Sequence, residues 1–258
     1  TMSRTSERWS ADEIFCDARA YDLAFAWDVS RELDVVLAIA NVRSADGPLL
    51  LPACGTGRYA LALAERGFDV DGSDINDGML AIARSRPHPR ARYVNADMTR
   101  SLGDRTYAAA FTFTNSFRYI LDEDDVAAHF REMHARLRSG ATYVIDLGLT
   151  MGHKAHGAGA RWTVRYDDCV VRATWSLVAV TPPLSLERAR IVVENVDGTT
   201  NEVTSDQPQR VWSLDTLTRA AEAAGFRVRA HRTNGCLAAP PVGDGRFYVA
   251  LDRLGGPE

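Results

Sequence analysis

The sequence contains few cysteines and almost no lysine. Its four cysteines, at positions 16, 54, 169 and 236, lie far apart and include no C-x-x-C pair. A disulfide framework or a zinc site is therefore not expected. His153 and His156 stand three residues apart, but no acidic or thiol side chain lies at ligand spacing, so we expect no metal there. Of the 30 basic residues only Lys154 is a lysine, which indicates a GC-rich coding bias.

Long apolar runs are also missing. No run approaches the ~18 residues that span a membrane, and the start has no charged segment followed by an apolar one. The sequence therefore predicts a soluble, cytoplasmic protein that does not use a membrane. The net charge of −4 argues against a nucleic-acid partner. We expect the modest basic series Arg84, Arg86, Arg90 and Arg92 to solvate a helix end and the following loop.

A large core is nevertheless possible, because 46% of the 258 residues are hydrophobic. Residues 49–60 are the most informative stretch. The apolar run Leu49–Leu51 leads into a glycine turn and then into a helical pattern. Such a turn brings backbone N–H groups and a helix N-terminus close to a ligand. The spacing Gly55-x-Gly57-x-x-Ala60 also satisfies the loose dinucleotide fingerprint, although a tight strand-to-helix connection would look the same.

Further strands end in polar residues. The strand pattern Phe68–Asp74 ends in a carboxylate that suits a ribose, 91–94 is followed by Asp97, and 107–114 by Asn115. Asp122 is a plausible start for a helix that Ser139-Gly140 would end, and a fifth strand is predicted over 143–147. Short loops between strands and helices indicate a parallel, doubly wound sheet. Because ligands bind at the carboxyl ends of such strands, these polar groups are expected to converge there.

The pattern changes near residue 150. Alternating residues between 161 and 212 predict an antiparallel meander of three or four strands, which would serve as a lid or a dimer layer. A helix from Ser213 and two strands, 226–232 and 246–252, follow. We expect an N-terminal helical cap over 1–45, a cofactor-binding core over 46–150, the inserted layer over 151–212, and a C-terminal part, 213–258, that completes the core sheet.

Three motifs together resemble the class I S-adenosylmethionine-dependent methyltransferases. They are Ala53-Cys54-Gly55-Thr56-Gly57, Val70-Asp71-Gly72-Ser73-Asp74 and Asn95-Ala96-Asp97-Met98. The resemblance implies a Rossmann-like seven-stranded sheet of order 3-2-1-4-5-7-6 with the last strand antiparallel. It also implies S-adenosylmethionine as the cofactor, with S-adenosylhomocysteine as product.

The resemblance assigns a cofactor role to nine positions besides Tyr21. Ala53, Gly55 and Gly57 would line the methionine part, and Asp74 would bind the ribose. Ile75 and Met79 would bracket the adenine, Asp97 and Met98 would meet its edge, and Thr114 would meet the amino group. Arg58 is a further candidate, which would support the cofactor's carboxylate where the usual acid is missing.

Within the family the chain looks like bacterial small-molecule methyltransferases, including amino-sugar N-methyltransferases. That likeness implies that Tyr21 touches both cofactor and substrate. Tyr119 stands where those sugar enzymes place a histidine, and we take both tyrosines as catalytic candidates. The groups expected to line the substrate pocket are Trp27, Asn115, Arg118 and Trp162, although packing alone would explain the tryptophans.

Two residues depart from the family pattern. Leu51 replaces a usual acid that supports the cofactor's amino group, and Ala53 replaces a frequent glycine. The predicted function is methyl transfer to a nitrogen or oxygen of a small metabolite, with a homodimer as one option. Two alternatives stay open. The glycine spacing also permits a nicotinamide-dependent oxidoreductase. The replacement of the usual acid by Leu51 would also be consistent with a non-catalytic binding protein that kept the fold.

Overall fold

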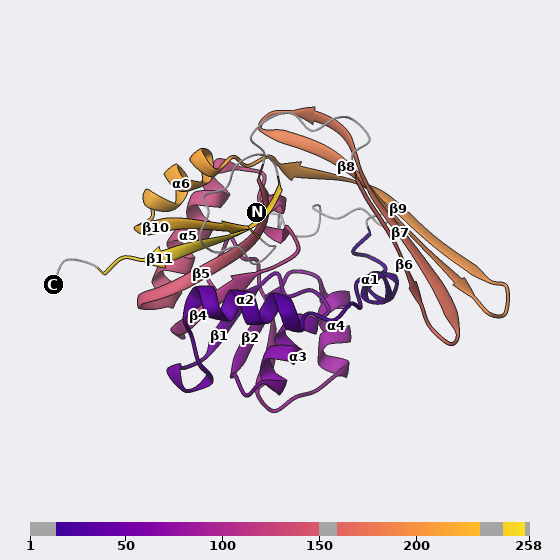
Figure 1. Ribbon diagram of the computed structural model, residues 1–258, viewed down its shortest axis with the longest axis horizontal. Helices are drawn as coiled ribbons and strands as arrows, with labels where there is room; N and C mark the ends of the chain where they lie inside the picture. Colours follow the sequence, from indigo (N-terminus) through magenta and orange to yellow (C-terminus); the bar gives the residue numbers. More distant parts are fainter. Residues whose placement is uncertain (1–13, 150–158, 233–244, 256–258) are drawn as a thin grey trace, which may run out of the picture. The chain divides into compact units, whose positions relative to one another are not determined.

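The computed structural model describes residues 14–149, 159–232 and 245–255 (Figure 1). The chain divides into two compact units. We call residues 28–154 with 210–258 the large unit, and residues 1–27 with 155–209 the small unit. The domain boundaries predicted at residues 45, 150 and 212 stay a prediction. His153, His156 and Cys236 lie outside the described residues.

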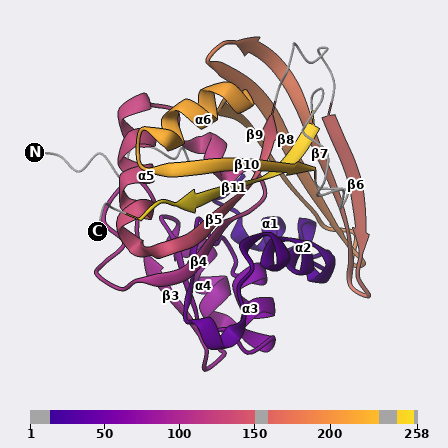
Figure 2. The same cartoon turned by 60° about the vertical axis from the view of Figure 1, so that its left-hand side comes forward.

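The large unit is built on a seven-stranded sheet of order β10-β11-β5-β4-β1-β2-β3 (Figure 2). Its strands are β1 (Leu49–Pro52), β2 (Val70–Asp74), β3 (Ala91–Asn95), β4 (Tyr107–Thr112), β5 (Leu137–Leu149), β10 (Phe226–Arg232) and β11 (Gly245–Arg253). The first five pair in parallel, whereas β11 runs antiparallel to both β5 and β10. Numbered along this sheet, the order is 3-2-1-4-5-7-6, so the predicted topology is confirmed.

The helices described in the large unit are α2 (Ser30–Ala40), α3 (Arg58–Glu65), α4 (Asp77–Ser85), α5 (Glu123–Arg136) and α6 (Leu214–Glu222), with short 3₁₀ turns η1 (Ser44–Asp46) and η2 (Ser116–Tyr119). Of these helices, α4, α5 and α6 begin at polar side-chain caps. Asp122 and Ser213 accept backbone N–H bonds at the starts of α5 and α6, as the sequence predicted. None of the helices in the described part of the chain is long and apolar enough to cross a membrane.

Two element boundaries differ from the prediction. The helix expected to end at Ser139-Gly140 ends at Arg136, because the buried Leu137 is already extended and starts β5. Gly140, at φ +76°, then lies inside the strand near an irregular step in its pairing with β4. The strand also begins six residues earlier than the predicted start at Tyr143. Before the sheet, α1 ends at Ala24 and α2 begins at Ser30.

The small unit contains α1 (Ala18–Ala24) and a four-stranded sheet of order β6-β7-β8-β9. The strands are β6 (Gly159–Arg165), β7 (Cys169–Thr181), β8 (Leu184–Asn195) and β9 (Thr200–Arg210). This agrees with the predicted antiparallel meander. Phe25 lies within its core and meets the edge of the Trp162 ring, with centroids 5.3 Å apart. The Trp162 indole N–H donates to the Ala24 carbonyl at 2.6 Å.

A buried histidine links α5 to the sheet of the large unit. His129 is fully buried, with Nδ1 2.8 Å from the Met98 carbonyl oxygen and Nε2 3.0 Å from Tyr143 Oη. Tyr143 Oη lies 2.7 Å from Thr112 Oγ1. Because a carbonyl only accepts, Nδ1 carries the proton and Nε2 accepts from the tyrosine. Burial lowers the pKa of His129 to about 4.

This shift predicts that the free energy of unfolding falls as the pH drops from about 6.5 to about 4. In that range the unfolded chain binds a proton at His129 that the folded chain excludes, so lower pH favours unfolding. The contribution amounts to about 3 kcal/mol at most. Urea unfolding of wild type and His129→Gln across this range measures it.

The variant should show a flatter dependence on pH than wild type. His88→Gln, in the loop after α4, is the control and should keep the wild-type slope. Equal slopes for wild type and His129→Gln would contradict the assignment.

Candidate functional site

In the glycine turn after β1, every second residue from 53 to 57 has a backbone conformation in the left-handed region. Ala53, Gly55 and Gly57 have φ of +54°, +55° and +79°. A Cβ at Gly57 would lie 2.8 Å from both the Ala83 Cβ and the Tyr93 hydroxyl, so this glycine is required for packing. A Cβ at Gly55 would meet no atom within 4 Å. The turn is therefore packed on one side and open on the other, where a ligand can approach the backbone.

Asp74, at the end of β2, holds this turn in place. Its Oδ2 accepts from the Gly55 N–H at 2.8 Å and its Oδ1 accepts from the Asn76 N–H at 3.0 Å. Asn76 caps α4 by accepting from the Met79 N–H, so Asp74 is not the helix cap. Burial raises the pKa of the Asp74 carboxyl above its usual value. The carboxylate thus joins two neighbouring strand ends.

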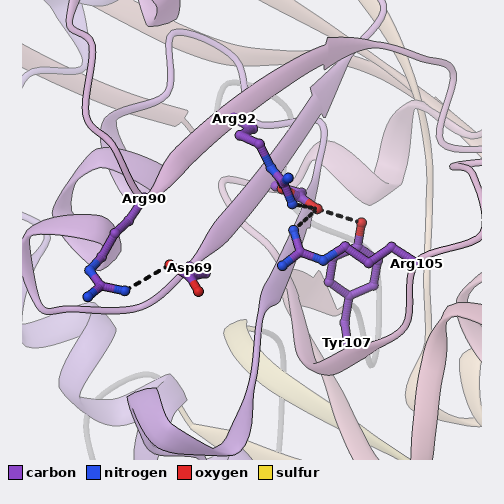
Figure 3. Close-up of polar contacts among 6 residues, drawn as sticks. Asp69, Arg90, Arg92, Arg105 and Tyr107 are labelled. Atoms are coloured by element: carbon purple, nitrogen blue, oxygen red, sulfur yellow. Dashed lines mark hydrogen bonds and ion pairs between the residues drawn. The ribbon is translucent and has the colours of Figure 1, made fainter.

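The arginine that ends α4 also braces the turn. Arg86 donates from NH2 to the Thr56 carbonyl at 2.9 Å. The sequence assigned Arg86 to helix-end solvation and missed this contact. The other arginines of the series pair with neighbouring groups, as Figure 3 shows for Arg90 with Asp69.

A separate charged group lies on the first half of β2. Arg92, Arg105 and the Tyr107 hydroxyl converge on the Asp71 carboxylate at 2.8 to 2.9 Å (Figure 3). Asp71 lies three residues before Asp74 on the same strand. Because successive strand residues advance by about 3.3 Å, this group is separate from the turn.

The end of β3 carries the next predicted residues. Asp97 Oδ1 accepts from both the N–H and the hydroxyl of Thr99 at 2.8 Å, which closes a tight turn. The Met98 carbonyl is the partner of His129. Ile75 is half-buried and Met79 is buried at the start of α4. The structure therefore places these residues at the carboxyl ends of β2 and β3.

Beyond β4 the backbone is strained. Thr114 and Asn115 have φ of +58° and +60°. This conformation is uncommon for non-glycine residues and least favourable for a β-branched one, at about 1–3 kcal/mol each. The Arg58 guanidinium reaches this turn, with NH2 3.5 Å from Thr114 Oγ1, and lies 4.5 Å from the Tyr59 ring centroid.

Two residues of η2 have different environments. Arg118, predicted to bind substrate, is buried and donates from Nε to the Arg210 carbonyl at 3.1 Å. Tyr119 is half-buried. The structure thus gives Arg118 a bracing contact within the large unit.

Three predicted residues belong to the small unit. Tyr21 stacks on Phe25 with ring centroids 4.2 Å apart. Trp27 and Trp162 meet edge to face at 6.4 Å. These contacts are those of a packed aromatic core, and the ligand roles of the three residues stay predictions.

Four charged and polar residues of the large unit were missed. The Tyr59 hydroxyl donates to the Glu32 carboxylate, and Asp146 pairs with Arg246 through both carboxylate oxygens. Burial raises the pKa of Tyr59. Burial alone would lower the pKa of Arg246, but the adjacent Asp146 raises it. Asp146 is the one charged residue in the apolar stretch 143–149 of β5, and this pattern could have identified it from the sequence. No comparable pattern marks Glu32.

The same region lacks an acid on β1. Leu51 is buried, with 1% of its surface exposed, among the apolar side chains of the sheet. Within residues 14–149, 159–232 and 245–255, no group of three or more His, Cys, Asp or Glu could hold a metal ion. The site therefore consists of backbone donors, the Asp74 and Asp97 carboxylates and the strained turn after β4.

Comparison with known proteins identifies this arrangement. The family model for a methyltransferase domain matches residues 50–140. A Geobacillus sp. (strain WCH70) protein that is named as a methyltransferase is 26% identical over 181 residues, which cover 68% of this chain and 72% of the relative. Residues 50–140 therefore form a methyltransferase domain, and the chain is an S-adenosylmethionine-dependent methyltransferase. This sets aside the nicotinamide-dependent alternative.

Solved structures share the fold of this methyltransferase. The S-adenosylmethionine-bound amino pentose methyltransferase CalS10 of Micromonospora echinaspora is 22% identical, with a TM-score of 0.73 over 91% of this chain and 95% of that one. The sugar N-methyltransferase KedS8 of Streptoalloteichus sp. ATCC 53650 is also 22% identical, with a TM-score of 0.75 over 96% and 95%. At these identities the likeness is one of fold.

The left-handed conformation of Ala53 predicts that Ala53→Gly stabilises the methyltransferase. In the left-handed region the alanine Cβ costs about 1–2 kcal/mol that glycine avoids. Glycine in turn loses about 0.5–1 kcal/mol more conformational entropy than alanine on folding, which offsets part of this gain. We expect the free energy of unfolding to rise by about 0.5–1 kcal/mol. Urea unfolding measures this change.

Ala81→Gly is the matched control, because Ala81 is exposed in the middle of α4. There the same substitution should lower stability by about 1 kcal/mol. Equal destabilisation at both positions would show that Ala53 is not strained.

Proposed function

We propose that this methyltransferase methylates a nitrogen or oxygen atom of a small metabolite, with amino sugars as first candidates. The observation that carries the proposal is the gathering of the glycine turn, Asp74, Asp97 and Thr114 at the carboxyl ends of β1 to β4. The similar structures of CalS10, an amino pentose methyltransferase, and KedS8, a sugar N-methyltransferase, support the substrate class.

The residues present fit the cofactor. The open face of Gly55 leaves room for the methionine part, which Ala53, Gly57 and Arg58 would also line. Asp74 is a carboxylate at a strand end, the group that binds ribose hydroxyls in such sheets. We propose that Ile75 and Met79 bracket the adenine, that Asp97 and Met98 meet its edge, and that Thr114 meets the amino group.

When bound, S-adenosylmethionine would supply an electrophilic methyl group, which the acceptor atom attacks in line while the carbon–sulfur bond breaks and S-adenosylhomocysteine leaves as a neutral thioether. The chain then has to orient the acceptor and exclude water. We assign acceptor orientation to Tyr119 and acceptor contacts to Asn115 and Arg118, all in the large unit. The roles expected for Tyr21, Trp27 and Trp162 in the small unit stay predictions. A neutral amine needs little acid–base help, whereas a hydroxyl needs a base. His129 is fully buried and bonded on both nitrogens, so it does not serve as that base.

An assay of methyl transfer tests the function. Purified protein is incubated with S-adenosylmethionine carrying a labelled methyl group and with a panel of amino sugars, other amines and hydroxyl compounds. Labelled product from an amine supports the proposal, and labelled product from hydroxyl compounds alone would move it to oxygen. No transfer to any acceptor, with the cofactor bound, would refute it. The predicted homodimer and cytoplasmic location stay predictions.

The ribose role predicts that Asp74→Asn weakens binding of S-adenosylhomocysteine about 10- to 100-fold. An amide accepts more weakly than a carboxylate and also perturbs the Gly55 N–H bond. Isothermal titration calorimetry gives the dissociation constants of wild type and variant.

Asp71→Asn is the control, since Asp71 lies on the same strand but bonds Arg92, Arg105 and Tyr107. Its affinity should stay within about twofold of wild type. An unchanged affinity in Asp74→Asn would overturn the ribose assignment.

A further inference from the structure

Three hydrogen bonds tie the strained turn after β4 to the end of β5. The Thr114 N–H donates to Asp146 Oδ2 at 2.9 Å, and the Asn115 N–H donates to the Asp146 carbonyl at 3.2 Å. The Gly148 N–H donates to Asn115 Oδ1 at 2.5 Å. Asp146 therefore receives the amides of both left-handed residues, one through its side chain and one through its backbone.

The Asp146 side chain is almost completely buried, with 1% of its surface exposed. A buried carboxylate is unfavourable unless it is paired and hydrogen-bonded. Here Arg246 on β11 supplies the charge, with Nε 2.5 Å from Oδ1 and NH2 bonded to Oδ2. Arg246 and Asp146 come from adjacent antiparallel strands, so the sheet itself fixes their approach. A satisfied buried network of this kind rigidifies the groups that it bonds.

The turn lies where the cofactor's methionine end is proposed to bind. Thr114 Oγ1 is 3.5 Å from the Arg58 guanidinium, and Arg58 is the first residue of α3, directly after Gly57. β1 supplies no carboxylate to this end, because it consists of three leucines and a proline and its Leu51 is buried. The buried carboxylate that bonds the turn comes from β5.

We propose that Asp146 is a positioning residue that holds the Thr114–Asn115 turn in its cofactor-binding conformation, in place of the missing acid on β1. The assignment rests on the proposed cofactor site. Asp146 acts through the backbone amides and not by touching the cofactor. Arg246 orients the Asp146 carboxylate by bonding both of its oxygens.

Asp146→Asn tests the proposal, because neither orientation of the amide reproduces the contacts. If its oxygen faces Thr114, its NH2 group faces the Arg246 Nε–H, and the reverse orientation opposes the Thr114 N–H. We expect the dissociation constant for S-adenosylhomocysteine to rise about tenfold or more. Hydrogen exchange of the Thr114 and Asn115 amides should also speed up in the ligand-free protein.

Asp252→Asn is the matched control. Asp252 on β11 pairs with Arg229 through two contacts of 2.8 Å and accepts from the Thr142 hydroxyl, near the opposite end of β5. Its loss should destabilise the sheet, leave the affinity within about twofold of wild type and leave exchange in the turn unchanged. Arg246→Lys is the second variant if Asp146→Asn does not fold. Lysine keeps the positive charge but cannot bond both carboxylate oxygens as the guanidinium does, so we expect smaller increases in the dissociation constant and in the exchange rate.

The outcomes separate this proposal from the proposed function. Wild type that fails to bind S-adenosylhomocysteine would refute the cofactor site, and the role of Asp146 with it. If wild type binds S-adenosylhomocysteine, and Asp146→Asn shows the same affinity and the same amide exchange in the turn as wild type, only the role of Asp146 is overturned. Equal losses in the Asp146 and Asp252 variants would show general destabilisation and would also overturn it.

Discussion

The hydrogen bond from the Gly55 N–H to Asp74 Oδ2 is the contact on which the site depends. It joins the turn after β1 to the end of β2, two strands that already pair in parallel. Because parallel strands bring their carboxyl ends to one edge, a single carboxylate is able to hold a turn whose residues occupy the left-handed region. Burial removes water from that carboxyl and so raises its pKa above the usual value.

Buried polar pairs brace the neighbouring strand ends in the same way. His129 bonds the Met98 carbonyl and Tyr143, which connects the turn after β3 to the core beneath it. Asp146 and Arg246 do the same for the turn after β4. In each case a polar side chain is buried away from water, and hydrogen bonds to backbone groups near the carboxyl ends of the strands compensate for the lost hydration. A methyl-transfer enzyme benefits from such rigid edges, because its main task is to align two reactants.

The predictions succeeded where a residue's chemistry depends on its place in one strand and the turn after it. The glycine turn, the strand-end acid Asp74 and the caps Asp122 and Ser213 are local signals, and the structure contains each of them. They failed where the decision depended on distant residues. Leu137 ends a helix early because it joins the core. Arg118, whose substrate role stays a prediction, also donates to the Arg210 carbonyl, 92 positions away, and no local pattern indicated that contact. The lone Asp146 in an apolar strand was a visible signal whose partner, Arg246, lies 100 positions along the chain.

By itself the sequence determined the order of strands and helices, because periodicity and turns are encoded within a few dozen residues. The strand order of the sheet and the cofactor class followed from the resemblance of three short motifs to a known family. Only the tertiary structure decided how the strand ends are held. It showed that Ala53 and Thr114 accept a conformation that their side chains disfavour, and that a carboxylate from β5 bonds the turn after β4 where β1 offers only Leu51. The reason is physical: backbone strain and buried charge persist only when surrounding contacts compensate them, and those contacts come from residues far apart in the chain.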